Sequence, residues 1–122
     1  MKMDLIVDSW AWSEIISGNK KVARALGGYT LKTPSLVLAE IYRSLLRKGL
    51  ADGSASKIVG GIMNRSVVLD LDSAHALAAG RLAVKESMHL SDAVIYSFAD
   101  DTAPLLTGDP DFRGKKNVVF IG

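Results

Sequence analysis

The strongest indication of the fold is the segment Leu5-Ile6-Val7-Asp8-Ser9, in which an apolar run is followed at once by an acid and a hydroxyl residue. Three strand-forming residues are too few for a helix and are typical of a buried strand. Asp8 and Ser9 are residue types that begin helices, since their side-chain oxygens accept hydrogen bonds from free N–H groups. The stretch therefore predicts a buried strand that runs directly into a helix.

The same alternation of short apolar strands and helices continues along the chain. Further strands are expected over 29–32, 67–69, 104–107 and 118–121, with a tight turn at 109–111. Helices are expected over 9–18, 19–27, 36–48, 54–64, 73–87 and 90–99, the third of them introduced by Thr33-Pro34-Ser35. Apolar strands separated by helices are typical of a parallel sheet covered on both faces. The predicted fold class is α/β, a three-layer α/β/α sandwich with a central parallel sheet of about four or five strands.

Composition restricts the class of protein. A chain of 122 residues suffices for one domain, so 1–122 is expected to form a single domain. The absence of cysteine excludes disulfide scaffolds, zinc ribbons and iron–sulfur clusters. No apolar run approaches the roughly 18 residues of a membrane span, and Asp4 precedes any long apolar stretch, so we expect a cytoplasmic protein without a membrane partner. The net charge of +2 does not by itself indicate nucleic-acid binding.

Three acids fall where the strands of such a sheet end. Asp8 follows the first strand, Asp109 comes shortly after the fourth, and Asp92 lies in the helix that leads into the fourth. Because ligands bind outside the carboxyl ends of parallel strands, these acids are expected to converge there. Each acid alone has an ordinary explanation, as a helix cap, as a charge at a helix N-terminus or as part of a turn.

Glu40 is a weaker candidate when it is judged by spacing alone. It lies on the helix expected over 36–48, opposite the predicted apolar stripe, next to Arg43 along the same face. The stripe comprises Leu38, Ala39, Ile41, Tyr42, Leu45 and Leu46. Spacing favours an exposed carboxylate paired with Arg43, an interaction of a few tenths of a kcal/mol. Only the other acids make Glu40 a candidate for the site.

A group of carboxylates at one point has a chemical consequence. Two like charges about 4 Å apart repel by about 4 kcal/mol at an effective dielectric constant of about 20. Such a group must therefore bind protons or a cation. All-oxygen ligands select hard ions such as Mg²⁺ or Mn²⁺, and such an ion beside basic residues suits phosphodiester hydrolysis.

Four segments of the chain resemble the PIN domain, and within it the VapC-type toxin ribonucleases of prokaryotic toxin–antitoxin pairs. The segments are LIVDSWAW at 5–12, LVLAEIY at 36–42, MHLSDAVI at 88–95 and LLTGDPDF at 105–112. Their order and gaps fit the family across nearly the whole chain. The resemblance implies a compact α/β/α sandwich and Mg²⁺- or Mn²⁺-dependent endoribonuclease activity on single-stranded or looped RNA.

The resemblance also implies roles for the four acids. Asp8 and Asp92 would be the principal metal ligands. Glu40 would complete the quartet by orienting or deprotonating a ligand water. Asp109 would be the fourth acid and could hold a second metal, and the choice between one metal and two stays open.

Further residues are assigned around these acids. By resemblance, Ser9 and Thr107 would brace the acids as supporting residues. Asp111 is a further supporting residue that competes with Asp109 for the fourth acidic role. His89 stands where the family often has Ser or Thr, so the helix cap is expected to fall to Ser91, with His89 near the mouth of the site. Candidate RNA-phosphate contacts are Arg43, Arg47 and Arg113.

Partners follow from the same resemblance. Family members usually form homodimers and are neutralised by a cognate VapB-type antitoxin. Trp10 and Trp12 cannot face the same neighbour from a helix, so one is expected in the core. For the other, a dimer or antitoxin surface and ordinary half-burial both stay open.

Two alternatives stay open from the sequence. One is a catalytically silent PIN-like module that binds RNA or an antitoxin. The other is a receiver-like domain that accepts a phosphoryl group on Asp70, at the end of the strand expected over 67–69.

Overall fold

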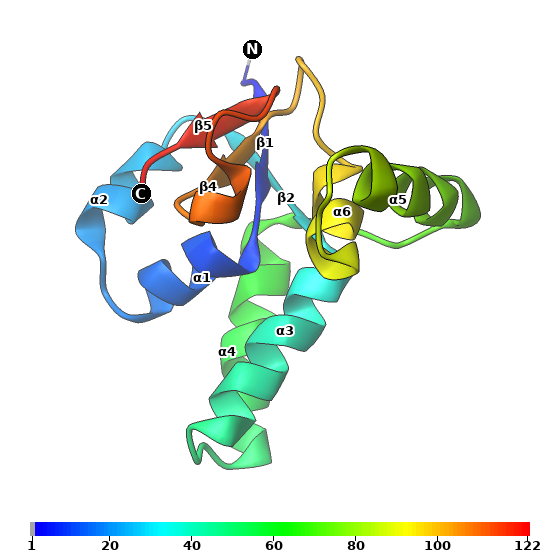
Figure 1. The fold of residues 1–122 in the computed structure, drawn as a ribbon. Helices are drawn as coiled ribbons and strands as arrows, with labels where there is room; N and C mark the ends of the chain where they lie inside the picture. Colours follow the sequence, from blue (N-terminus) through cyan, green and yellow to red (C-terminus); the bar gives the residue numbers. More distant parts are fainter. Residues whose placement is uncertain (1) are drawn as a thin grey trace.

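The computed structural model describes residues 2–122 and shows a parallel sheet flanked by helices (Figure 1). The strands are β1 (Asp4–Val7), β2 (Thr30–Pro34), β3 (Val67–Leu69), β4 (Leu105–Thr107) and β5 (Val118–Phe120). The helices are α1 (Ser9–Ile16), α2 (Lys20–Ala25), α3 (Ser35–Arg47), α4 (Asp52–Arg65), α5 (Ser73–Lys85), α6 (Leu90–Tyr96) and the 3₁₀ turn η1 (Pro110–Phe112). The predicted α/β class with a five-stranded parallel sheet is confirmed.

The order of the strands determines where a site can form. The order across the sheet is β3-β2-β1-β4-β5, and every neighbouring pair is parallel. From β1 the chain moves outward to β2 and β3, and then returns through α5 and α6 to β4 on the other side of β1. The ends of β1 and β4 therefore flank a switch point, and α/β sheets bind ligands at such points.

The helices are divided between the two sides of the sheet. Figure 1 shows α1 and α2 on one side, α5 and α6 on the other, and the α3–α4 pair extending away from the strands. The central strand β1 is covered on both sides, since Leu5, Ile6 and Val7 are all almost completely buried. A continuous apolar run is what such a strand requires, because both of its faces meet helices.

Two local predictions need correction. The strand expected to end at residue 32 continues through Thr33 and Pro34, and the third helix begins at Ser35, one residue before the expected start. Burying Thr33 in β2 lets it bond to α1, and this interaction favours strand there. The strand β3 lies at the edge of the sheet, so Asp70 does not end a central strand as the receiver-like alternative requires.

The predicted apolar stripe of α3 is also partly wrong. The buried residues are Val37, Ile41 and Leu45, whereas Ala39 is exposed and Leu46 is 42% exposed. These fully buried residues follow i, i+4 spacing, and α3 packs against α4, α1, α6 and β2. Glu40 therefore lies at the border of the buried face and not on its far side.

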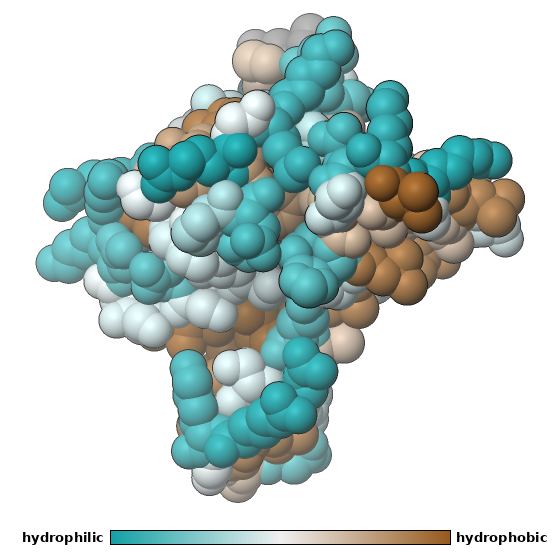
Figure 2. Space-filling view, viewed as in Figure 1, coloured by the Kyte–Doolittle hydropathy of each residue, from teal (hydrophilic) through white to brown (hydrophobic). Residues whose placement is uncertain are grey.

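The helix α5 carries exposed apolar side chains. Leu77 is 63% exposed and Val84 is 83% exposed. In the space-filling view, the hydrophobic colour gathers over this part of the molecule, on the right (Figure 2). Among residues 2–122, no helix is both long and apolar enough to cross a membrane.

A buried chain of hydrogen bonds joins α1 to the sheet and to α4. The Trp12 indole N–H donates to Thr33 Oγ1 at 3.0 Å. The Thr33 hydroxyl in turn donates to Ser66 Oγ at 2.9 Å, and Ser66 donates to the Ile62 carbonyl at 2.9 Å. The indole of Trp12 thus fixes the helix that carries Ser9 relative to the strands.

Replacing Trp12 by Phe should therefore destabilise the protein beyond the lost contact area. The Thr33 hydroxyl would lose its buried donor, which typically costs about 1–3 kcal/mol. Urea unfolding of the wild type, Trp12→Phe, Thr33→Val and the double variant measures the coupling. We expect the two changes together to cost less than the sum of the two alone. Strictly additive losses would contradict a role for this hydrogen bond.

Candidate active site

Asp8 and Thr107 join the ends of the two central strands at the switch point. Asp8 is only 3% exposed, and its Oδ1 accepts a hydrogen bond from the Ala11 N–H at 2.9 Å, which caps α1. Its Oδ2 accepts a hydrogen bond from the hydroxyl of Thr107, the last residue of β4. Asp8 is thus both a helix cap and a link between strands.

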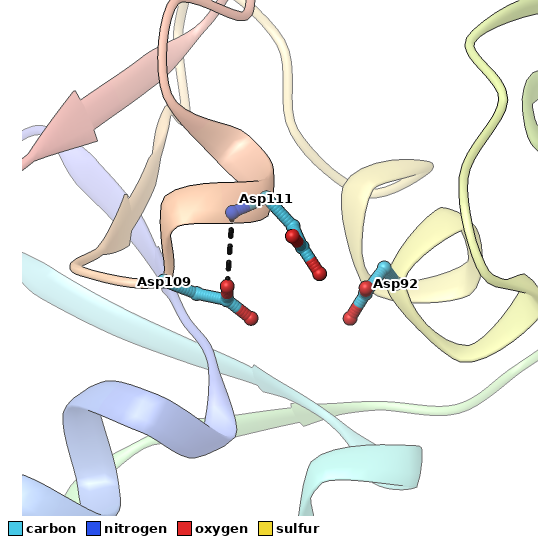
Figure 3. A group of neighbouring side chains, drawn as sticks. All are labelled: Asp92, Asp109 and Asp111. Carbon is cyan, nitrogen blue, oxygen red and sulfur yellow. Dashed lines mark hydrogen bonds between the residues drawn. The ribbon is translucent and has the colours of Figure 1, made fainter.

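The loop after β4 turns two further acids toward α6. The Asp109 N–H donates to Thr107 Oγ1 at 3.0 Å, and the Asp111 N–H donates to Asp109 Oδ1 at 3.0 Å. Figure 3 shows both carboxylates pointing toward Asp92, which lies in the first turn of α6. One carboxylate oxygen from each of the three acids lies within 4.8 Å of the others. Asp92, Asp109 and Asp111 could therefore share one metal ion.

Glu40 reaches the same region from α3. The Ser9 hydroxyl donates to Glu40 Oε1 at 3.0 Å, and the side chain of Glu40 is half-buried. An open cleft of about 360 Å³ has Asp8, Glu40, Asp92 and Asp109 together in its lining. The structure thus brings the four predicted acids to one cleft, and it places Asp111 at the margin of that group.

The electrostatics of the cleft favour neutralisation. Burial raises the pKa of Asp8 to about 7, and the nearby charges of Asp109 and Glu40 add to the rise, against the hydrogen bonds from Thr107 and Ala11. Burial also raises the pKa of Glu40, with a further contribution from the charge of Asp92. The pKa of Asp92 is raised by burial and then by the charges of Asp109 and Asp111. Each shift shows that negative charge is disfavoured here.

Among residues 2–122, no cationic side chain forms an ion pair with these acids. Within residues 2–122, the ion pairs are Lys32–Asp4, His75–Asp72 and Lys115–Glu86, and none involves an acid of the cleft. The ligand atoms are all carboxylate oxygens, which are the donors that Mg²⁺ and Mn²⁺ prefer. The residues present therefore fit a hard divalent cation.

The basic candidates are distributed unevenly around the cleft. Arg43 lines it, and its charge lowers the pKa of Glu40 against the larger effect of burial. Arg47 is exposed at the end of α3, one turn further along. The Arg113 guanidinium stacks over the Phe120 ring at 4.6 Å from its centroid. Of the three, only Arg43 shares the cleft with the acids.

Two further residues near the acids differ from expectation. His89 is the N-cap residue of α6 but makes no capping hydrogen bond through its side chain, while Ser91 lies inside the helix. His89 lines a smaller neighbouring cavity of about 150 Å³ together with Asp92 and Asp111. Trp10 lines the main cleft, a position that sequence reasoning did not assign to it; its closeness to Asp8 was the available signal.

The family model described as the PIN domain matches residues 5–117. The chain belongs to the PIN domain family. No curated protein matches the chain significantly.

Solved structures that resemble this PIN domain share its fold at low sequence identity. A toxin–antitoxin complex from Klebsiella pneumoniae has a TM-score of 0.81 at 17% identity, over 95% of this chain and 96% of that chain. VapBC2 from Rickettsia felis, bound to a promoter DNA fragment, has a TM-score of 0.78 at 18% identity, over 98% of each chain. DNA-bound VapBC from Salmonella typhimurium has a TM-score of 0.76 at 17% identity, over 98% and 97%.

The raised pKa of Asp8 predicts how stability depends on pH without metal. Folded Asp8 keeps its proton up to about pH 7, whereas an unfolded Asp releases it near pH 4. The free energy of unfolding should therefore fall as pH rises through this window. In urea unfolding with EDTA, the wild type should lose about 2–4 kcal/mol more than Asp8→Asn between about pH 4 and pH 8. Asp101→Asn, which changes an exposed acid, should keep the wild-type slope. An equal slope in Asp8→Asn would contradict the assignment.

Proposed function

We propose that this PIN domain is a Mg²⁺- or Mn²⁺-dependent endoribonuclease that hydrolyses RNA phosphodiester bonds in the cytoplasm as the toxin of a VapBC-type pair. The observation that carries the proposal is the convergence of acids from separate elements at the switch point. Asp8, Glu40, Asp92 and Asp109 share one cleft, and none of them has an ion-pair partner within residues 2–122. A bound cation would offset the repulsion among these carboxylates, which explains why the fold brings them together.

Asp92, Asp109 and Asp111 are the residues that would hold the ion, because their oxygens already lie within 4.8 Å of one another. A bound Mg²⁺ or Mn²⁺ would lower the pKa of a water and neutralise charge on the phosphate. Asp8, which is almost completely buried at the base of the cleft, would contribute a further ligand oxygen. Its two oxygens each accept one hydrogen bond and each retain a second lone pair.

Glu40 would act on the attacking water, and Arg43 would act on a phosphate of the RNA. The Ser9 hydroxyl holds Glu40 Oε1, which leaves Oε2 to accept a proton from the attacking water. Because burial raises its pKa, Glu40 is a better proton acceptor than an exposed glutamate. Arg43 would bind a phosphate from the same helix. Arg47 and Arg113 would contact more distant phosphates.

The partners we propose are a VapB-type antitoxin and a second copy of this chain. The antitoxin proposal is supported by the likeness to structures described as toxin–antitoxin and VapBC complexes. The homodimer is supported by α5, whose apolar groove includes Leu77, Gly80 and Val84. The small residue Gly80 between two exposed apolar side chains would let a second helix approach closely.

Asp92→Asn should weaken Mn²⁺ binding and RNA cleavage together, because Asp92 belongs to the group that would hold the ion. Removing a direct ligand should lower the cleavage rate by on the order of 100-fold or more. Calorimetric Mn²⁺ titration and cleavage of single-stranded RNA on the same samples measure both effects. Asp101→Asn is the matched control, since Asp101 is an exposed acid that lies before the amino end of β4, whereas the cleft lies beyond the carboxyl ends of the strands.

Each other result contradicts part of the proposal. Mn²⁺ binding by the wild type without cleavage of any RNA would favour the catalytically silent binding module. Failure of the wild type to bind Mn²⁺ would show that the carboxylates serve only as caps and turn residues. Full activity in Asp92→Asn would show that Asp92 is neither a metal ligand nor a catalytic residue.

The proposed dimer predicts that a charge on α5 separates the two copies. Val84 is 83% exposed, so Val84→Glu should leave the fold intact while placing a carboxylate in an apolar interface. Light scattering after gel filtration should report a dimer for the wild type and a monomer for the variant. Lys57→Glu, on the exposed side of α4, should remain dimeric. A dimeric Val84→Glu variant would exclude this face.

A further inference from the structure

The two tryptophans of α1 have different environments. Trp12 is 1% exposed and bonded within the core, whereas Trp10 is only half-buried. Two positions along a helix differ by about 200°, so the side chains leave the helix in nearly opposite directions. Burial of Trp12 therefore directs Trp10 toward the ends of the strands. There it lines the cleft of about 360 Å³ with Ser9, Glu40 and Asp109.

Gly108 fixes the position of the Trp10 ring. A Cβ atom at Gly108 would lie 2.3 Å from Trp10 Cζ2 and 2.4 Å from Cη2, far inside van der Waals contact. The six-membered ring of the indole thus lies directly against the backbone between Thr107 and Asp109. Trp10 therefore forms a wall of the cleft that packs on the same loop that carries Asp109.

The charge of the cleft makes such a wall useful. Until a cation binds, the carboxylates repel the phosphates of RNA, and of the described residues that line the cleft only Arg43 is basic. Affinity for an RNA strand must then come partly from its uncharged parts. Base–aromatic stacking supplies this, because every base presents a π-face whatever its sequence. Single-stranded RNA offers unstacked bases that duplexes do not.

We propose that Trp10 is the stacking wall for one base of a single-stranded RNA whose neighbouring phosphate lies at the acids. The inference rests on the proposed nuclease function and gives the substrate site its first base contact. An RNA base is favoured over a protein side chain because Trp10 lies in the acid-lined cleft, apart from the apolar groove on α5. Trp10 is a positioning residue and takes no part in proton transfer.

Steady-state cleavage of a short single-stranded RNA tests whether Trp10 stacks on a base. Trp10→Leu keeps an apolar side chain but removes the ring, so KM should rise by about 5-fold to about 100-fold, with kcat within about 3-fold of the wild type. Trp10→Phe should recover most of the loss. Tyr29→Leu is the matched control, since Tyr29 is a half-buried aromatic residue just before β2, at the amino ends of the strands and away from the cleft. Thermal unfolding of each variant checks that the fold is retained.

A binding measurement separates this inference from the nuclease proposal. Comparing the wild type with Trp10→Phe isolates the fluorescence of Trp10, because the chain has two tryptophans. With EDTA present to prevent cleavage, a single-stranded oligoadenylate should quench its fluorescence, and an abasic strand of equal length should not. Equal quenching by both strands, or none, would overturn the stacking role.

The outcomes for the two proposals differ. Cleavage with unchanged KM in Trp10→Leu would overturn the wall and leave the nuclease standing, and Trp10 would then be a protein-contact residue. Base-dependent quenching by a protein that cleaves no RNA would keep the wall and overturn the nuclease. A raised KM in Trp10→Leu that Trp10→Phe restores, together with base-dependent quenching, would support both.

Discussion

The hydrogen bond from Thr107 to Asp8 is the constraint on which the site depends. It joins the last residue of β4 to the residue that follows β1, across the point where the order of the strands reverses. Asp8 also caps α1 and thereby sets the direction of the helix that carries Ser9 and Trp10. The Thr107 hydroxyl oxygen accepts a hydrogen bond from the Asp109 N–H, and this bond fixes the turn that carries Asp109 and Asp111. One buried pair thus positions groups from both halves of the sheet.

The same arrangement is electrostatically costly to the fold. Asp8 is buried without a cation, and its pKa is raised to about 7, so ionising it near neutral pH opposes folding. Glu40 and Asp92 have raised pKa values for the same chief reason, which is loss of water. An apolar residue at any of these positions would remove that cost. Acids that weaken a fold at its most constrained point are typical of functional sites.

The sequence predicts this fold well wherever local pattern and burial agree. The run Leu5–Val7 is buried as predicted, and Asp8 caps the next helix because both signals are local. The environment of Glu40 was not predictable, since the border of the buried face on α3 depends on where α1 packs. Asp111 joins Asp92 only through the fold of η1, which residue spacing does not specify. Such positions are decided by tertiary contacts that a single sequence does not display.

The position of Trp10 illustrates how a core residue can determine a functional one. The hydrogen bond between Trp12 and Thr33 requires one face of α1 to be buried, and helix geometry then directs Trp10 to the cleft. Gly108 leaves room for the ring, and a larger residue there would displace either the ring or the loop that carries Asp109. The wall and the acids therefore share one support. A change in the loop would alter both the metal-binding oxygens and the surface proposed to hold the base, so the two cannot be adjusted independently.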